Sequence, residues 1–241
     1  MIATGKIRAR IGYTSPLLLT ESFPYEFYKV VPEGVRLVLT TLAIHTYTPE
    51  EVAKSLDMTL DASRKMAKAG VDLIILGGVP LNFSLGYERL ESTMRDLEAE
   101  TGVPVTSSLT MQMKAMRTLG ATKVAVGHPI AETKSIYNEY LTHYGFEMVG
   151  QLGGGRTVSN QSVQQPDAAL QLGRSLSEHF PDADTLYFPS PHWGTMNVIE
   201  DIEHELRVNA LSATLAILWD SMRSCGINEQ LKGYGRLFRD F

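Results

Sequence analysis

β-prone runs recur along the chain at regular intervals and predict the strands of a mainly parallel sheet. The clearest run is Val71–Leu76, whose unbroken apolar character is typical of a strand that is buried on both faces. The other expected strands are 10–14, 35–42, 103–105, 123–126, 146–149, 185–188 and 208–211.

Amphipathic segments alternate with these strands and predict helices. The best defined one begins with Thr48 as N-cap, has Pro49 at its first helical position and ends before Gly70. The remaining helices are expected at 86–101, 108–119, 132–144, 167–179, from about 195, and at 213–224. Strands that alternate with helices throughout predict an α/β protein.

The elements can be divided into two half-chains of similar order. We expect a C-terminal α/β domain at 109–212 and an N-terminal α/β domain at 1–108, to which the last helix and the tail, 213–241, return. The glycines at 153–155 are expected to form a flexible break, either a lid or a turn.

Charge and cysteine usage exclude several classes of partner. The chain has 241 residues and a formal net charge of −5, which argues against nucleic acid and membrane surfaces as partners. Cys225 is the only cysteine, so no internal disulfide and no CxxC zinc site can form, and the histidines have no metal-ligand spacing. No apolar leader and no apolar run of roughly 20 residues is present, so we expect a cytoplasmic protein without metal.

The stretch 184–203 is the first candidate for chemistry, because a strand there runs through a short loop towards a helix. The carboxyl ends of parallel strands are where α/β proteins bind ligands, and a helix N-terminus offers N–H groups to an anion. Ser190 could act as a nucleophile or hydrogen-bond donor, and His192 as a general acid or base. Alternatively, Ser190 lies in a rigid turn between Pro189 and Pro191, and His192 is a surface residue. The GxSxG motif of hydrolases is absent, which disfavours a serine hydrolase.

Other strand ends carry further candidate residues. The pair Gly77 and Gly78 either lets a ligand approach the backbone or simply makes a tight exit from the strand. The remaining candidates, each expected after a strand, are Ser15, Pro16, Tyr47 and His128.

Four motifs resemble a known family: RIGYTSP near the start, TPEE at a helix start, DLIILGGVPLNF around the third strand, and GYGRLF near the end. Together they are similar to the aspartate/glutamate/hydantoin racemase superfamily, in the branch of arylmalonate decarboxylase and maleate cis–trans isomerase. This resemblance implies two Rossmann-like domains related by a pseudo-twofold axis, an active site in the cleft between them, and no cofactor.

The resemblance also shows where this chain departs from its family. Racemases and isomerases of the superfamily use two cysteines, whose positions match Gly78 and Ser190 here. Arylmalonate decarboxylase has glycine at the first position and keeps a cysteine at the second, which protonates the enediolate left when carbon dioxide departs. Because neither Gly78 nor Ser190 carries a thiol, two-base racemisation through thiols is excluded. The hydrogen-bond donors that the family has beside the first loop are also replaced here, by Val79 and Pro80.

These observations predict a cofactor-independent, decarboxylase-like carbon–carbon lyase that acts on a small malonate, aryl-substituted or not, or on a related carboxylate. His192 or His128 would supply the proton, and Ser190 would bind the carboxylate or the developing oxyanion. The expected substrate-binding residues are Ser15, Pro16, Tyr47, Gly78, Val79 and Pro191.

Two other functions stay open on the sequence. One is an isomerase, or another lyase or hydrolase, acting on an unsaturated dicarboxylate. The other is a non-catalytic protein that binds small carboxylates, which the missing cysteines favour. Family members occur in several oligomeric states, and the aromatic segment 23–28 is a candidate interface, so a homo-oligomer is also an expectation.

Overall fold

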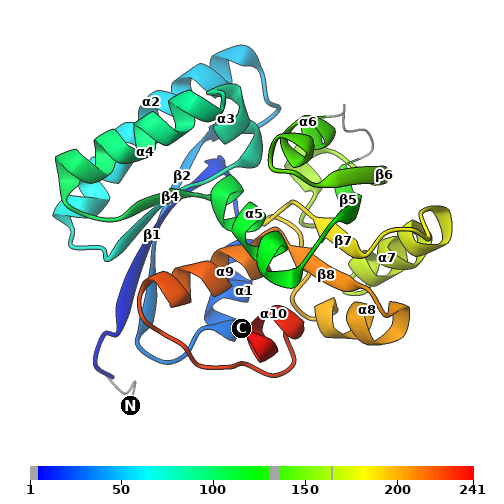
Figure 1. Ribbon diagram of the computed structural model, residues 1–241. Helices are drawn as coiled ribbons and strands as arrows, with labels where there is room; N and C mark the ends of the chain where they lie inside the picture. Colours follow the sequence, from blue (N-terminus) through cyan, green and yellow to red (C-terminus); the bar gives the residue numbers. More distant parts are fainter. Residues whose placement is uncertain (1–4, 131–135, 164) are drawn as a thin grey trace. The chain divides into compact units, whose positions relative to one another are not determined.

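Two four-stranded parallel sheets with the same strand order form the framework of the protein. The computed structural model describes residues 5–130, 136–163 and 165–241 (Figure 1). The first sheet has the order β2-β1-β3-β4 and the second the order β6-β5-β7-β8, and every strand pair is parallel. The strands are β1 (Ala9–Leu17), β2 (Val35–Ile44), β3 (Leu73–Leu76), β4 (Val105–Ser107), β5 (Lys123–Ile130), β6 (Glu147–Arg156), β7 (Thr185–Phe188) and β8 (Asn209–Ser212). The predicted α/β class with two similar halves is confirmed.

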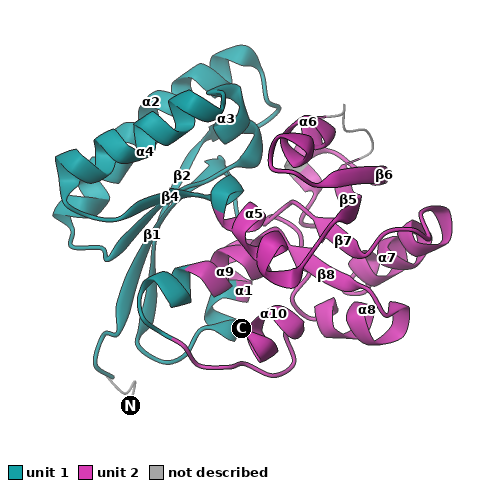
Figure 2. Cartoon of the chain, viewed as in Figure 1, with its two compact units in different colours: residues 1–20, 27–110, 221–227 teal, residues 21–26, 111–220, 228–241 magenta. Residues whose placement is uncertain are grey.

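The chain divides into two compact units, each of which contains one sheet (Figure 2). Unit 1 comprises Met1–Thr20, Phe27–Thr110 and Ser221–Ile227. Unit 2 comprises Glu21–Glu26, Met111–Asp220 and Asn228–Phe241. The domain boundaries expected from the sequence, 1–108 with 213–241 and 109–212, stay a prediction.

The helices connect the strands and pack on the sheets. They are α1 (Ser22–Val30), α2 (Pro49–Lys68), α3 (Val79–Ser84), α4 (Tyr87–Thr101), α5 (Ser108–Leu119), α6 (Ile136–His143), the 3-10 turn η1 (Val158–Asn160), α7 (Ala168–His179), α8 (Ile199–Leu206), α9 (Ala213–Ser224) and α10 (Arg236–Asp240). In unit 1, α2 and α4 lie side by side (Figure 1) and contact the first sheet. In unit 2, α7 and α8 contact each other and the second sheet. In the part of the chain that is described, no helix is both long and apolar enough to cross a membrane.

The start of α2 follows the sequence-based expectation. Glu51 N–H donates to Thr48 Oγ1 over 3.2 Å, and Thr48 N–H donates to the Glu51 carboxylate over 3.3 Å. This reciprocal capping box satisfies N–H groups that the first turn of a helix leaves without partners. Thr48 therefore acts as the expected N-cap.

Several sequence-based boundaries are wrong, and strand pairing or proline explains three of them. The glycines 153–155 do not break the chain but lie within β6, where Gly153 pairs with His128 of β5. Residues 127–129, expected as a loop, accordingly belong to β5. The strand expected at 103–105 is β4, two residues later, because Pro104 has no N–H and contributes only its carbonyl, which accepts from Ile74.

Two further helix boundaries differ from expectation. The helix expected from about 195 begins at Ile199, after a turn. For the helix expected at 132–144, the described residues form α6, and 132–135 lie outside the described residues.

An aspartate fastens the start of one inner strand in each sheet. Asp72, just before β3, accepts the N–H of Arg10 over 2.8 Å. Asp184, just before β7, accepts the N–H groups of Thr122 over 3.0 Å and Lys123 over 2.9 Å, and also the hydroxyl groups of Thr122 and Thr185. Burial alone would raise the pKa of the Asp184 carboxyl, but these hydrogen bonds outweigh it and lower that pKa overall.

We predict that Asp184→Ala lowers the free energy of unfolding at pH 7 by about 1–3 kcal/mol, because several donors lose a charged acceptor. Because the pKa of Asp184 is lowered in the folded protein, the wild type is more stable than the variant above the ordinary aspartate pKa. This extra stability is lost as the pH falls through the pKa of Asp184 in the folded protein. Urea unfolding of both proteins between pH 7 and pH 3 measures this. The matched control is Asp182→Ala, which changes an exposed neighbour. Equal stability of the two variants at pH 7 would contradict the role of Asp184.

Candidate functional site

In unit 2, the loop that follows β7 is buried rather than exposed. Ser190 is 4% exposed and His192 is 5% exposed, and Pro191 between them is also buried. The alternative reading of His192 as a surface residue is therefore wrong. The loop continues into Trp193, whose ring packs edge-on against Phe188 at the end of β7, with 5.8 Å between ring centres. This aromatic contact places the loop against the carboxyl end of its own strand.

The Ser190 hydroxyl takes part in a short chain of hydrogen bonds. Its Oγ donates to Gln161 Oε1 over 2.6 Å and accepts the backbone N–H of His192 over 3.3 Å. Gln161 is itself buried, and its Nε2 donates to the carbonyl of Val158 over 3.0 Å. Because Nε2 is held by a carbonyl, the side-chain oxygen of Gln161 faces Ser190 and directs the serine proton towards itself.

Sequence reasoning missed Gln161. It follows η1 in a polar stretch with no strong helical or strand pattern, and it is 29 residues from Ser190. Only the folded chain brings the two together, so no local signal could have identified it.

His128 lies within β5, the neighbour of β7 in the second sheet, and is 7% exposed. Its Nδ1 accepts the backbone N–H of Ile130 over 3.1 Å, and its ring centre lies 5.4 Å from that of Tyr137. A ring nitrogen that accepts cannot carry a hydrogen, so this contact selects the neutral ring with its hydrogen on Nε2. Burial lowers the pKa of His128 to about 3, which agrees with this neutral form.

Burial has the same effect on the imidazole of His192 and lowers its pKa to about 3 as well. Both histidines are therefore neutral at physiological pH, and an imidazole of either residue becomes a proton donor only when a nearby anion raises its pKa.

The N–H groups expected to bind an anion after β7 are already occupied. The buried Glu26 of α1 accepts the N–H of Thr195 over 2.7 Å and that of Met196 over 2.8 Å, all within unit 2. A carboxylate of the protein thus stands where the sequence suggested a ligand. The separation of about 170 residues explains why sequence reasoning did not find this pair.

In unit 1, Ser15 and Pro16 lie inside β1 and not after it as expected. The pairing of β1 with β2 shifts between Ser15 and Leu17, because Pro16 has no N–H to offer. The Ser15 hydroxyl is fully buried and its Oγ has no hydrogen-bond partner among the described residues. A buried hydroxyl without a partner is costly, so this atom is a candidate to contact a ligand.

The two glycines after β3 are required by packing within unit 1. A Cβ on Gly77 would lie 1.9 Å from the carbonyl oxygen of Thr14. Gly78 has φ of +89°, and a Cβ there would lie 2.8 Å from Cβ of Pro16. A cysteine at 78 would consequently meet both backbone strain and a steric clash. The tight-exit interpretation is supported, and Val79 follows directly as the buried first residue of α3.

Tyr47 adopts an unusual backbone conformation after β2, with φ of +65°. The Glu51 carboxylate accepts the N–H groups on either side of it, from Thr46 over 2.9 Å and Thr48 over 3.3 Å. Burial raises the pKa of the Tyr47 phenol, so the hydroxyl stays protonated and available as a donor. Non-glycine residues with a positive φ are often found at functional sites.

Each unit thus gathers its own predicted residues at the carboxyl ends of its strands: Ser190, Pro191, His192 and His128 in unit 2, and Ser15, Pro16, Tyr47, Gly78 and Val79 in unit 1.

Cys225 follows α9 in unit 1, where burial first and the nearby Asp72 second raise its pKa to about 11. Its thiol is protonated at physiological pH and is therefore a weak nucleophile. The described residues contain no group of three or more His, Cys, Asp or Glu side chains arranged to hold a metal ion.

Comparisons of the sequence with known proteins give the same family twice. The family model for arylmalonate decarboxylase matches residues 19–238. Arylmalonate decarboxylase of Bordetella bronchiseptica is 26% identical over 218 residues, which cover 87% of this chain and 91% of that protein.

Solved structures show the same fold. A liganded double variant of arylmalonate decarboxylase, with one glycine changed to cysteine and one cysteine to serine, has a TM-score of 0.87 at 23% identity and covers 97% of this chain and 100% of that chain. A variant of the maleate isomerase from Pseudomonas putida S16 with maleate has a TM-score of 0.83 at 18% identity, covering 96% and 97%. The resemblance inferred from motifs and the prediction of an enzyme are both confirmed, and the chain belongs to the arylmalonate decarboxylase family.

Proposed function

We propose that this enzyme is a cofactor-independent, decarboxylase-like carbon–carbon lyase that acts on a small malonate, aryl-substituted or not, or on a related carboxylate. The observation that carries the proposal is the match of the arylmalonate decarboxylase family over nearly the whole chain. In the proposed reaction, the bond between the α-carbon and one carboxylate breaks and carbon dioxide leaves. The electron pair stays on the substrate as an enediolate, which then takes one proton at the α-carbon.

Ser190 is proposed to bind charge rather than to donate the proton. A serine hydroxyl is far too weak an acid to replace the thiol that the family uses at this position. As a neutral donor, however, it can stabilise the remaining carboxylate or the enediolate oxygen. Its hydrogen bond to Gln161 would be exchanged for one to the substrate, and the N–H of His192 holds its oxygen in place meanwhile.

His192 is the proposed proton donor, with His128 as the second candidate. Each ring is neutral in the free protein because burial lowers its pKa to about 3. A substrate carboxylate beside the ring would raise that pKa, since an opposite charge within about 4–6 Å favours the charged form. The imidazolium would then protonate the α-carbon and recover its proton from solvent. His128 is less suited, because its Nδ1 already accepts from Ile130.

The residues of unit 1 are proposed to bind substrate. The buried Ser15 hydroxyl, which lacks a partner among the described residues, and the protonated Tyr47 phenol are candidate donors. Pro16, Gly78 and Val79 would supply apolar and backbone surface in unit 1, and Pro191 would do so in unit 2.

An isomerase that acts on an unsaturated dicarboxylate is the second candidate function. The fold that the chain shares with maleate isomerase favours it. The two candidates differ in their product, because the isomerase releases no carbon dioxide.

We predict that the protein decarboxylates methylphenylmalonate in deuterated buffer, with one deuteron placed at the α-carbon. Ser190→Ala and His192→Ala should each lower kcat by at least about 100-fold, the usual contribution of one oxyanion donor or one general acid. Proton NMR measures both turnover and deuteration. His204→Ala is the matched control, since His204 is exposed on α8. Unchanged turnover in both site variants would refute the assignment.

We predict that Ser190→Cys raises the decarboxylation rate by at least about tenfold. The change restores a thiol, whose pKa near 8.5 suits proton transfer far better than that of a hydroxyl. The matched control is Ser175→Cys, on α7, which should leave the rate unchanged. A Ser190→Cys enzyme that folds normally but is slower than wild type would show that the proton reaches the α-carbon by another route.

We predict that both buried histidines stay neutral in the free protein down to about pH 4, because their pKa is lowered to about 3. The unfolded chain takes up these protons near pH 6.5, so the free energy of unfolding should fall as the pH drops below 6.5, by up to about 1.4 kcal/mol per pH unit for each ring. Nitrogen-15 NMR of the imidazole rings, with and without phenylmalonate, measures their charge. If the His192 ring stays neutral with ligand bound between pH 6 and 8, it is not the proton donor.

A further inference from the structure

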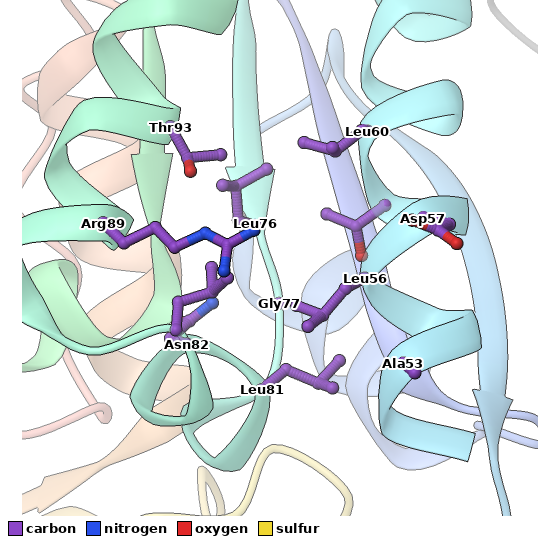
Figure 3. A pocket seen from close by; sticks show the side chains of 12 residues that line it. Ala53, Leu56, Asp57, Leu60, Leu76, Gly77, Leu81, Asn82, Arg89 and Thr93 are labelled. Atoms are coloured by element: carbon purple, nitrogen blue, oxygen red, sulfur yellow. The ribbon is translucent and has the colours of Figure 1, made fainter. Parts of the chain in front are cut away.

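Unit 1 contains a pocket of about 260 Å³ that none of the proposed substrate-binding residues lines. It lies between α2, α3 and α4, beside the end of β3 (Figure 3). In the view, Leu56 and Leu60 come from α2 on one side, and Arg89 extends from α4 towards Leu76 on the other. Its volume is slightly below the range of about 300–1,000 Å³ that is typical of small-molecule sites.

Leucine is the most frequent residue type in the pocket wall. Leu56 and Leu60 of α2, Leu76 of β3 and Leu81 of α3 all line it. A ligand that enters would bury apolar surface against these side chains, which is favourable in proportion to the area removed from water. The wall therefore suits an aliphatic chain.

Asn82 supplies a directed donor at the base of this pocket. It is only 3% exposed, and its Oδ1 accepts from the Ser108 hydroxyl over 3.1 Å and from the N–H of Leu109 over 3.4 Å. Because a backbone N–H requires an acceptor, these contacts fix which end of the amide is oxygen. The Nδ2 group makes no hydrogen bond to any described residue, and Asn82 lines the pocket. An amide N–H₂ that lines a pocket and has no protein partner among the described residues is available to a ligand acceptor.

Arg89 adds a positive charge on the same side. It lies in the first turn of α4, and its guanidinium makes no ion pair or hydrogen bond with any described residue. The other charged residue that lines the pocket is Asp57 of α2, on the opposite side in Figure 3. Asp57 repels an anion from its own side, so a negative head group is directed towards Arg89 and Asn82.

We propose that this pocket is a second binding site, which takes a small aliphatic monocarboxylate. The carboxylate accepts hydrogen bonds from Asn82 Nδ2 and the Arg89 guanidinium, and the aliphatic chain packs among Leu56, Leu60 and Leu81. The bound molecule undergoes no reaction. The site is independent of the proposed decarboxylation, because no proposed catalytic residue lines it.

Methyl NMR of leucine-labelled protein titrated with sodium hexanoate tests the proposal. We expect saturable shifts of the Leu56, Leu60 and Leu81 methyl signals. Hexylamine, which has the same chain and the opposite charge, should leave them unmoved. Equal shifts with both compounds would show a non-specific apolar pocket and overturn the carboxylate assignment, as would no shift with hexanoate.

Variants separate this site from the proposed active site. Arg89→Gln should weaken hexanoate binding at least tenfold. The control Arg95→Gln should leave binding unchanged, because Arg95 lies further along α4, where its guanidinium is 3.8 Å from the Glu91 carboxylate. Asn82→Asp keeps the acceptor for Leu109 but replaces the donor by a negative charge, so it should abolish binding while the circular dichroism spectrum stays that of the wild type. Ser190→Ala should not alter the leucine shifts. If Arg89→Gln binds as tightly as Arg95→Gln, or if Ser190→Ala abolishes the shifts, the proposal is wrong.

Discussion

Each sheet depends on an aspartate that fixes where one inner strand begins. Asp72 and Asp184 accept N–H groups from the strand beside them, and both precede the third strand of their sheet in chain order. In a parallel sheet, strands that start at one edge must end at the other, so this contact also sets which residues emerge at the functional edge. The inner strand β3 consists of apolar residues only, so its faces offer no position for polar chemistry.

The sequence was sufficient for the features that are local. The capping box at Thr48 and the apolar runs of β3 and β7 follow from neighbouring residues, and so the α/β class could be predicted. The errors arose where a distant partner decides the outcome. β5 extends through His128 because Gly153 pairs with it, and residues 195–198 stay outside α8, where Glu26 already accepts two of their N–H groups. Gln161 was missed for the same reason.

The histidines illustrate how burial changes a chemical role. On sequence alone, an imidazole looks suited to proton transfer near neutral pH. Burial removes His128 and His192 from that range and leaves both neutral. Acid chemistry at either ring would therefore require a bound anion that raises the pKa of the imidazole. Without such an anion, both rings stay neutral at physiological pH.

The contact between Gly78 and Pro16 has an evolutionary consequence. A Cβ at position 78 would meet Pro16 on the neighbouring strand while the backbone has a positive φ. One codon change could supply a thiol at position 190, but a single change at position 78 would be selected against by its effect on folding before any activity was gained. A side chain at position 78 would first require Pro16 to change, so the order of substitutions is constrained. Pro16 and Gly78 are therefore expected to change together and not singly.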